Sequence, residues 1–448
     1  MRMRTRTAIA ALLTAGLVPL SGTAPASAAP AKHADDFNGD GYRDYVHTWW
    51  GGSAGGGLRV TFGTANGPGT ATQLIDQGSP GVPGADETDD MFGEVRAAAD
   101  FDRDGYGDLA VAALGEDVDG REDQGAVTIL WGSASGLSGG TSVPNKGAKQ
   151  SFGHFGQDLA TGDFNGDGKP DLAAVSASKA YVYRGTLTRS GTTGSVTTLD
   201  KTSFNAEALI AGKVTKDSAT DLVIIGEVVS PGVRAADAWF IKGGSTLTSG
   251  KTLRVNKSAT EGGDGLVADF DKDGYGDIAI GNGADAKHKG AVSIWRGGST
   301  GPGTSTRLTQ ASSGVAGTPE AEDNFGADLS AGDTNGDGYP DLAVGAYGEA
   351  VDGSDYAGGV HILRGGSGGV TGTASQWFAR NSPGIPGALD MDDYFGATVR
   401  LRDTDRDGFA DLYVTGTVGS LRLSGSSSGI TTAGATAVDT ELVGGFLQ

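Results

Sequence analysis

An acidic nine-residue segment recurs along this sequence, with oxygen-bearing side chains at its positions 1, 3, 5 and 9 and glycine at position 6. It reads DFNGDGYRD from Asp36, DFDRDGYGD from Asp100, DFNGDGKPD from Asp163, DFDKDGYGD from Asp269, DTNGDGYPD from Asp333 and DTDRDGFAD from Asp403. Carboxylate and amide oxygens on one short turn are the ligands of a hard cation with flexible geometry, and calcium fits them best. The sequence therefore predicts about six Ca²⁺ sites.

One copy shows how such a loop would hold an ion. The carboxylates of Asp100, Asp102 and Asp104 can converge because the glycine at position 6 takes the positive φ that a sharp turn needs. The backbone carbonyl of Tyr106 then points inward, and Asp108 closes the cage. The alternative for any single copy is a solvated acidic turn without metal, but the repetition of the pattern favours a metal site.

The same positions define the expected ligands of every complete loop. The residues at positions 1, 3, 5, 7 and 9 are Asp36, Asn38, Asp40, Tyr42 and Asp44; Asp100, Asp102, Asp104, Tyr106 and Asp108; Asp163, Asn165, Asp167, Lys169 and Asp171; Asp269, Asp271, Asp273, Tyr275 and Asp277; Asp333, Asn335, Asp337, Tyr339 and Asp341; Asp403, Asp405, Asp407, Phe409 and Asp411. A degenerate copy, KVTKDSATD, has Lys213 and Thr215 in place of two ligands. There we expect a folded turn without metal, with the lysine ammonium where the ion would lie.

The loop differs from an EF-hand, which requires an acidic residue at position 12 and flanking helices. Position 12 here is His47, Val111, Ala174, Ile280, Val344 or Val414. Short apolar segments rich in β-branched and small residues flank the loops instead, such as FGADLSAG before Asp333 and LAVGA after Asp341. Each loop is therefore predicted to be the tip of a β-hairpin.

A third segment repeats in step with the loops. An alternating strand that ends in a Gly/Ser-rich turn begins at Leu58, Ala126, Ala180, Ala238, Ala291, Gly359 and Ser420. A weaker fourth segment follows several of these strands, such as TATQLID from Thr70. Since the loops start 50 to 70 residues apart, each unit has the size of a four-stranded propeller blade. The predicted fold is all-β, a seven-bladed β-propeller with calcium-binding β-hairpin loops.

A Phe-Gly pair precedes four of the loops, and DxNGDGxxDL followed by LAVGA completes the pattern from Asp333 to Ala346. The pairs are Phe92-Gly93, Phe155-Gly156, Phe325-Gly326 and Phe395-Gly396. This pattern resembles the FG-GAP repeat of the integrin α-subunit propeller and of many secreted bacterial proteins, and the resemblance covers Asp36 to about Gly429. It implies calcium loops on one rim and ligand-binding loops on the opposite face. The fourth unit departs from the pattern because it lacks the Phe-Gly pair.

The first 28 residues have the features of a secretory signal peptide: early arginines, an apolar stretch from Ala8 to Leu20 and the cleavage signature Ala26-Ser27-Ala28. The sequence therefore predicts a signal peptide over 1–28 and a single propeller domain over 29–448. The expected location is extracellular, by secretion.

Composition restricts the partners. The formal net charge of −21 argues against nucleic acid or an anionic membrane surface as a partner. After the signal peptide no apolar stretch is long enough to span a bilayer, and the expected state is a monomer. With no cysteine in the chain, metal sites and circular closure must supply the rigidity that disulfides would give.

The sequence offers little for catalysis. The five histidines occur singly, and each is predicted to be a loop or strand surface residue. GxSxG around Ser53, Ser367 and Ser427 lies in Gly/Ser-rich turns of a β-only chain, so these matches are attributed to chance. Outside the metal loops, the acidic residues Glu116, Asp117, Glu122 and Asp123 are expected to form a solvated turn.

The sequence favours a secreted, calcium-binding, non-catalytic module for binding or cell adhesion, with an extracellular glycan or protein as its ligand. The alternative is an extracellular hydrolase or lyase that acts on polysaccharide or phospholipid, since related repeats occur beside such enzymes. A structural coat protein without a partner is a third possibility. Long turns on the face opposite the metal loops would bind the ligand, with Trp49, Trp50 and Tyr347 as candidate contacts.

The closure of the ring is open at the level of sequence. Only a few residues, 32–35, precede the loop of the first blade, so either they form a short inner strand or the tail 441–448 supplies it.

Overall fold

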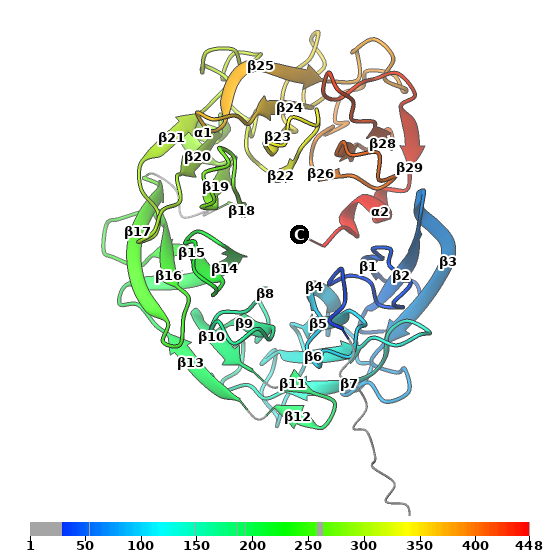
Figure 1. The fold of residues 1–448 in the computed structure, drawn as a ribbon, viewed down its shortest axis with the longest axis vertical. Coiled ribbons are helices and arrows are strands. Elements are labelled where there is room, and N and C mark those ends of the chain that lie inside the picture. The colour runs from blue at the N-terminus through cyan, green and yellow to red at the C-terminus, as the bar shows by residue number, and fades with distance from the viewer. Residues whose placement is uncertain are drawn as a thin grey trace, which may run out of the picture.

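The computed structural model describes residues 29–447, apart from 53, 148, 186, 193 and 258–262. The predicted signal peptide, 1–28, lies outside the described residues. Seven antiparallel sheets stand radially around a central axis, and the chain passes through them in sequence order (Figure 1). The protein is an all-β, seven-bladed propeller, as the sequence predicts.

The blades are meanders whose first strand lies nearest the axis in Figure 1. Blades 1 to 4 contain β1 (Tyr45–Trp49), β2 (Gly57–Thr64) and β3 (Gly67–Asp76); β4 (Phe92–Ala99), β5 (Asp108–Ala113), β6 (Ala126–Trp131) and β7 (Ser138–Val143); β8 (Leu159–Gly162), β9 (Asp171–Ser176), β10 (Lys179–Arg184) and β13 (Ser195–Leu199); β14 (Phe204–Gly212), β15 (Asp221–Val228), β16 (Ala236–Lys242) and β17 (Thr248–Asn256). A small hairpin of β11 (Leu187–Thr188) and β12 (Gly191–Thr192) is inserted in blade 3.

Blades 5 to 7 repeat the four-stranded pattern. They contain β18 (Gly265–Ala268), β19 (Asp277–Asn282), β20 (Ala291–Trp295) and β21 (Ser305–Leu308); β22 (Leu329–Gly332), β23 (Asp341–Ala346), β24 (Gly359–Arg364) and β25 (Thr371–Phe378); β26 (Val399–Arg402), β27 (Asp411–Val414), β28 (Ser420–Leu423) and β29 (Thr436–Val438). The short helices are α1 (Asp285–His288) and α2 (Thr440–Gly444).

The strand that follows each loop is the core of its blade. In β5, β9, β19 and β23 every residue is buried, because neighbouring blades cover both faces of the sheet. Between their first aspartate and their last residue these strands are therefore continuously apolar, with alanines such as Ala110 and Ala112 where blades approach closely. Full burial on two faces explains why their sequence shows no alternation of apolar and polar residues.

The hydrophobic core is divided among the interfaces between blades. Six interfaces, from blades 1–2 round to blades 6–7, each contain a cluster of 10 to 15 buried apolar residues. The interface between blades 7 and 1 has four: Tyr45, Tyr413, Val443 and Phe446. This interface, which we call the seam, has the smallest apolar cluster of the seven interfaces among the described residues.

The C-terminal tail closes the ring. Within the described residues, neither candidate segment forms a complete inner strand beside β1. Instead the Asp44 amide donates to the Asp35 carbonyl at 2.7 Å, and the Val46 amide donates to the Gly445 carbonyl at 2.9 Å. The ring of Phe446 stacks edge-on against Tyr45, with centroids 5.0 Å apart. Both segments considered from the sequence thus contribute, and the tail does so as the helix α2 rather than as a strand.

Candidate metal centres

In blades 2 to 7 the acidic loop joins the first and second strands, as the sequence predicts. The closing residue pairs of the hairpins include Ala99 with Asp108 and Gly332 with Asp341. The loops therefore lie on one rim of the propeller. In blade 1 the loop enters β1 without a preceding strand among the described residues.

Within a loop, backbone amides fold around the first carboxylate. The amides of Asp104 and Gly105 donate to Asp100 at 3.1 and 3.2 Å, and the Tyr106 amide donates to Asp104 at 3.1 Å. Gly105 has a φ of 94°, the left-handed conformation that the turn was predicted to need. The loop is thus preorganised with its carboxylates on the inner side.

In three loops the carboxylates converge tightly enough to share one cation. Their ligand oxygens lie within 4.8 Å of one another in the sets Asp100, Asp102 and Asp108; Asp269, Asp271 and Asp273; Asp403, Asp405 and Asp407. All nine residues are among the predicted ligands.

The aspartate at position 9 also ties its loop to the blade. One Asp108 oxygen accepts from the Phe101 amide and the other from the Gly132 amide at the end of β6, both at 2.8 Å. Burial raises the pKa of Asp108 to about 8, because the charged carboxylate is removed from water. The equivalent glycine bond occurs in the degenerate loop, where Gly243 donates to Asp221 at 2.9 Å. This structural role explains why the degenerate loop retains its last aspartate.

An arginine lies beside the extra carboxylate of each loop that has aspartate at position 3. The pairs are Arg189 with Asp102, Arg296 with Asp271 and Arg422 with Asp405. The loops with asparagine at position 3 carry no charge there that would need a counter-ion. Each arginine offsets the negative charge that aspartate adds there.

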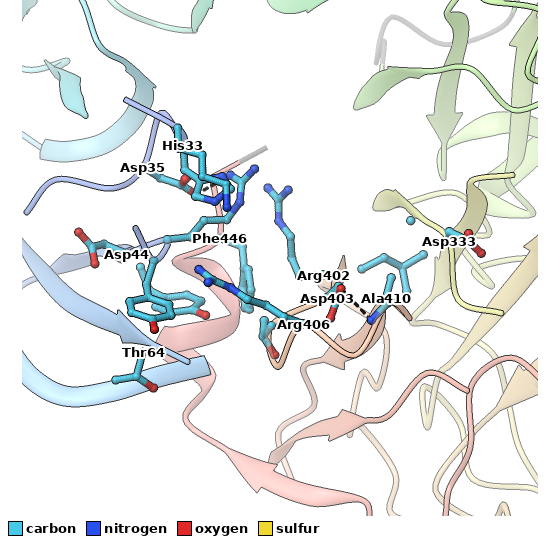
Figure 2. Close-up of a pocket in the computed structure, with 18 residues that line it drawn as sticks. His33, Asp35, Asp44, Thr64, Asp333, Arg402, Asp403, Arg406, Ala410 and Phe446 are labelled. Atoms are coloured by element: carbon cyan, nitrogen blue, oxygen red, sulfur yellow. Dashed lines mark hydrogen bonds and ion pairs between the residues drawn. The ribbon is translucent and has the colours of Figure 1, made fainter. Parts of the chain in front are cut away.

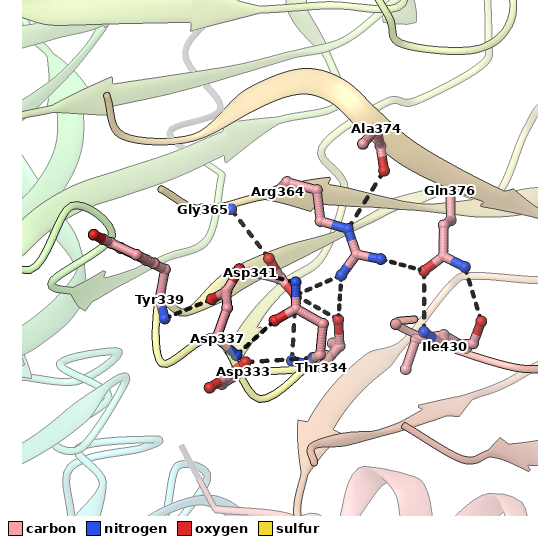
Figure 3. Close-up of polar contacts among 12 residues, drawn as sticks. Asp333, Thr334, Asp337, Tyr339, Asp341, Arg364, Gly365, Ala374, Gln376 and Ile430 are labelled. Atoms are coloured by element: carbon pink, nitrogen blue, oxygen red, sulfur yellow. Dashed lines mark hydrogen bonds and ion pairs between the residues drawn. The ribbon is translucent and has the colours of Figure 1, made fainter. Parts of the chain in front are cut away.

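Figure 3 shows the sixth loop and its support. The Tyr339 amide donates to Asp337 at 2.9 Å, and the Gly365 amide donates to Asp341 at 3.1 Å. Arg364 reaches Asp341 with an Nη1 to Oδ2 distance of 2.8 Å. The fully buried Asp341 is therefore neutralised by a guanidinium from the neighbouring strand β24.

The degenerate loop keeps its shape without its full ligand set. The Lys213 ammonium donates to the Ser218 carbonyl within the loop, and Lys242 lies 3.1 Å from Asp217. These contacts place two cationic side chains on the loop, in line with the expectation that a lysine takes the place of an ion.

Neighbouring loops are hydrogen-bonded along the rim. The backbone amide at position 8 donates to the carbonyl at position 1 of the preceding loop, between Gly107 and Asp36, Thr220 and Asp163, Gly276 and Lys213, and Ala410 and Asp333, at 2.6 to 2.7 Å. In the third and sixth loops position 8 is Pro170 or Pro340, which has no amide hydrogen.

Side chains connect the same loops. A basic residue at position 4 lies over the aromatic ring at position 7 of the next loop: Lys216 over Tyr275, Lys272 over Tyr339, and Arg406 over Tyr42, at 4.3 to 5.5 Å from the ring centroid. Where position 4 is glycine, as at Gly39, the ring of Tyr106 packs directly on the backbone. The rim therefore forms a nearly continuous chain of loop-to-loop contacts.

The predicted ligand face lies at the other ends of these strands. Trp49 packs on the glycines that follow it, Gly51 and Gly52, whereas the side chain of Trp50 is exposed (53%). Tyr347 lies in blade 6, so blade 7 separates it from both tryptophans along the ring.

Tyr347 belongs to an aromatic cluster on the turns of blades 6 and 7. The ring centroid of Tyr394 lies 6.1 Å from that of Tyr347 and 5.8 Å from that of Tyr356. Tyr356 and Tyr394 were not among the contacts predicted from the sequence. Tyr394 could have been found from its position directly before the pair Phe395-Gly396.

The prediction that every histidine is a surface residue was wrong. His361 is fully buried and His47 nearly so, and neither is a surface residue. His361 lies between the rings of Phe325 and Trp377, and burial lowers its pKa to about 3. His47 Nε2 lies 2.9 Å from Glu441 of the tail. No histidine–serine hydrogen bond occurs within the described part of the chain.

The cavity in Figure 2 lies at the seam. Its volume is about 510 Å³, and its lining includes His33, Asp35, Arg402, Arg406 and Phe446. A second cavity, of about 700 Å³, follows the central axis between the inner strands. Among the described residues, no helix is long and apolar enough to cross a membrane.

Comparisons with known proteins agree with this architecture. The family model described as FG-GAP repeat matches residues 92–130, 155–183 and 325–363, which lie in blades 2, 3 and 6. The chain thus contains FG-GAP repeats in three places and forms a seven-bladed propeller, as integrin α N-terminal domains do.

Curated relatives match part of the chain. It is 36% identical over 152 residues to phosphatidylinositol-glycan-specific phospholipase D of Rattus norvegicus, which covers 30% of this chain and 18% of that protein. It is 42% identical over 104 residues to the Mus musculus enzyme, covering 22% and 12%. The chain therefore spans less than a fifth of the length of these relatives.

Among solved structures, the chain is similar to an Agrocybe aegerita lectin described as recognising non-reducing terminal N-acetylglucosamine. The TM-score is 0.43 with 13% identity, over 84% of this chain and 87% of the lectin. A likeness of this degree carries no inference about ligand.

Proposed function

We propose that this protein is an exported, calcium-binding propeller that acts as a non-catalytic binding or adhesion module for an extracellular glycan or protein. The observation that carries the proposal is the convergence of three carboxylates within 4.8 Å in three of the rim loops. An oxygen-only ligand set of this kind suits calcium better than transition metals, which prefer nitrogen or sulfur ligands.

The residues present fit such an ion. Side chains at positions 1, 3, 5 and 9 and the carbonyl at position 7 would hold it, and its charge would compensate carboxylates that burial and mutual repulsion destabilise. Amide hydrogen bonds to the first aspartate already fix the turn, as in the loop at Asp269. The chain's own contribution is therefore a preorganised cage.

The metal is tested by comparing two aspartates at position 5. We expect Asp104→Ala to abolish one site, worth about 0.4 to 1.4 kcal/mol at millimolar calcium. Asp217→Ala, in the degenerate loop, should leave the calcium-dependent part of Tm unchanged. The measurement is thermal unfolding of both variants in calcium and in chelator. Equal Tm values of the wild type in the two conditions would overturn the calcium proposal.

The ligand face is tested separately, on the tyrosine cluster. Screening on glycan and matrix-protein arrays would first find a ligand. We then expect the Tyr347→Ala, Tyr394→Ala double variant to lose binding, because aromatic rings supply apolar platforms for sugars and side chains. Tyr275→Ala with Tyr339→Ala, on the calcium rim, is the matched control. Equal loss in both variants would mean that the ligand does not bind at the cluster.

The similarity to phospholipase D supports one alternative, a hydrolase that acts on a phospholipid or glycan. The match covers only a minor part of those enzymes, and the two buried histidines, His47 and His361, contact Glu441 and Trp377. An assay for product release, run beside the arrays, distinguishes the two functions. Release of product would favour the hydrolase, whereas binding of a ligand that stays intact would favour the binding module.

A further inference from the structure

Three connections between blades have the same form on the face opposite the calcium rim. They span 76–92, 309–325 and 379–395 and lead into the Phe-Gly pairs of blades 2, 6 and 7. Each contains a buried aspartate two residues before the phenylalanine and a buried long side chain near its start. These are Asp90 with Gln77, Asp323 with Gln310, and Asp393 with Arg380, all at most 5% exposed.

In the third connection the long side chain near the start is Arg380, whose guanidinium pairs with the buried aspartate. Arg380 Nε lies 2.7 Å from Asp393 Oδ2, and both side chains are almost completely buried. The other guanidinium nitrogens donate to the carbonyl oxygens of Pro386, at 3.0 Å, and of Gly419. The guanidinium is thus enclosed by oxygen atoms, and its charge balances that of the aspartate.

In the other two connections the arginine is replaced by glutamine and a glutamate is added. Gln77 Nε2 donates to Glu116 at 2.5 Å, and Gln310 donates to Glu349 in the same way. The glutamates come from the turns 114–125 and 347–358. The amides of Gly115 and Gly348, next to these glutamates, donate to the carbonyls of Asp90 and Asp323, and the charge of each aspartate acts on its glutamate. Each location thus has two interacting carboxylates, one from the connection and one from the turn, where the third connection has an arginine–aspartate ion pair.

No described side chain balances these charges by an ion pair. The ion pairs of the described residues do not include Asp90, Glu116, Asp323 or Glu349. Lys289, whose charge acts on Asp323, donates to the Pro319 carbonyl instead. Glu116, expected from the sequence to be solvated, is partly buried, so this expectation was wrong.

The glutamines supply an independent sign of a missing partner. The Oε1 atoms of Gln77 and Gln310 are both buried and accept no hydrogen bond among the described residues. Turning the side-chain amide of either glutamine by 180° would not remove this problem, because it would place Oε1 against the glutamate carboxylate, which cannot donate a hydrogen bond when ionised. Buried polar atoms without a partner are uncommon in native proteins and often mark a bound water or ion.

We propose that Gln77, Asp90 and Glu116, and likewise Gln310, Asp323 and Glu349, bind two further divalent cations, separate from the calcium rim. Two carboxylates and an amide oxygen are hard ligands, so calcium is the expected ion. Arg380 fills the equivalent position in the third connection as a permanent substitute. Each ion joins a connection between blades to a long turn, and the second lies under the turn that bears Tyr347.

The test is the number of calcium ions bound per chain, measured by equilibrium dialysis over about 0.01 to 10 mM calcium, a range that brackets the dissociation constants of extracellular calcium modules. Glu116→Gln with Glu349→Gln should bind two fewer ions than the wild type. Glu122→Gln with Asp355→Asn, exposed residues of the same two turns, should bind the same number as the wild type. The expected result is a difference of two ions between variant and wild type, so it does not depend on how many rim loops bind calcium.

A second variant separates loss of an ion from loss of structure. Gln77→Arg with Gln310→Arg copies the third connection, so it should also bind two fewer ions while its Tm in chelator exceeds that of the wild type. An unchanged ion count in both double variants overturns the proposal. Failure of rim binding alone would instead leave two ions bound to the wild type, and these two would disappear in both variants.

Discussion

At the scale of single residues, His361 shows how the fold changes the chemistry of a side chain. It is enclosed by Phe325 and Trp377, and neither ring nitrogen has a hydrogen-bond partner among the described residues. Burial holds its pKa near 3, below the ordinary value of 6.5. The folded protein therefore keeps this imidazole neutral where the unfolded chain would protonate it.

The sign of the pH effect follows from linkage. Between pH 6.5 and pH 3 the unfolded state binds the additional proton, so His361 lowers stability as the pH falls through this window. The loss is about 2 kcal/mol at pH 5 relative to pH 8. We expect His361→Leu to be more stable than the wild type, with a larger advantage at pH 5 than at pH 8. Denaturant unfolding at both pH values measures it; an advantage independent of pH would contradict the assigned cause.

Part of the candidate site could be predicted residue by residue from the sequence. The spacing of Asp100, Asp102 and Asp108 was sufficient to predict that their carboxylates contribute to one site, because all three lie in one nine-residue loop. Asp108 also accepts a hydrogen bond from the Gly132 amide. This contact depends on the strand β6 and could not be predicted from the loop sequence. The contact of the partly buried Glu116 with Gln77, 39 residues away, likewise could not be read from the turn alone.

At the scale of elements, the hairpin β11–β12 affects a loop of another blade. Arg189, at its turn, reaches Asp102 and Asp104 of the second loop at 2.9 and 2.7 Å. It neutralises part of the charge that an ion would otherwise neutralise. Because it is partly exposed, the contribution of the pair to stability is about 0.2 to 1 kcal/mol.

We expect Arg189→Gln to lower Tm slightly in chelator and to increase the gain in Tm that calcium produces, since the competing cation is removed. Arg184→Gln is the control, because Arg184 donates to the Ser245 carbonyl and makes no ion pair in the described structure. Calcium titrations followed by thermal unfolding give both quantities. A smaller calcium gain in Arg189→Gln than in the control would contradict competition.

The strands were largely predictable, and the exceptions have physical reasons. Alternating segments from Leu58 and Ala126 form β2 and β6 as expected. The helix α2 and the incomplete first blade were not predicted in form, because α2 is stabilised by contacts with β1 far away in sequence. A helix as short as α2 is not stable through its local sequence alone and forms only when tertiary contacts stabilise it.

At the scale of the whole molecule, the seam is the least filled interface. It has four buried apolar residues and adjoins the cavity of about 510 Å³. The remaining interfaces bury larger clusters, so both neighbours of a blade stabilise it. We therefore expect unfolding to begin at the seam.

Phe446 tests this expectation. Its ring contacts Tyr45 and Tyr413, one from each side of the seam. Phe446→Ala should destabilise the protein by about 3 kcal/mol, the cost of removing a buried aromatic ring. Phe152→Ala, at a phenylalanine that is 55% exposed, should have little effect. Denaturant unfolding compares the two, and deletion of 443–448 should resemble Phe446→Ala. Similar stability of both alanine variants would mean that the tail does not close the ring.

The position of α2 also has a consequence for biosynthesis. The contact of Arg59 with Glu441 joins residues 382 apart in sequence, and the bond from Val46 to Gly445 is of similar range. A ribosome releases blade 1 before the other blades, whereas α2, which completes blade 1, follows blade 7 in the sequence. Blades 2 to 6 can assemble on one another as they appear, while the first blade waits with β1 unpaired on its inner edge. Blade 1 is thus completed only after blade 7 has been made, and until then the inner edge of β1 is open to pairing with other strands.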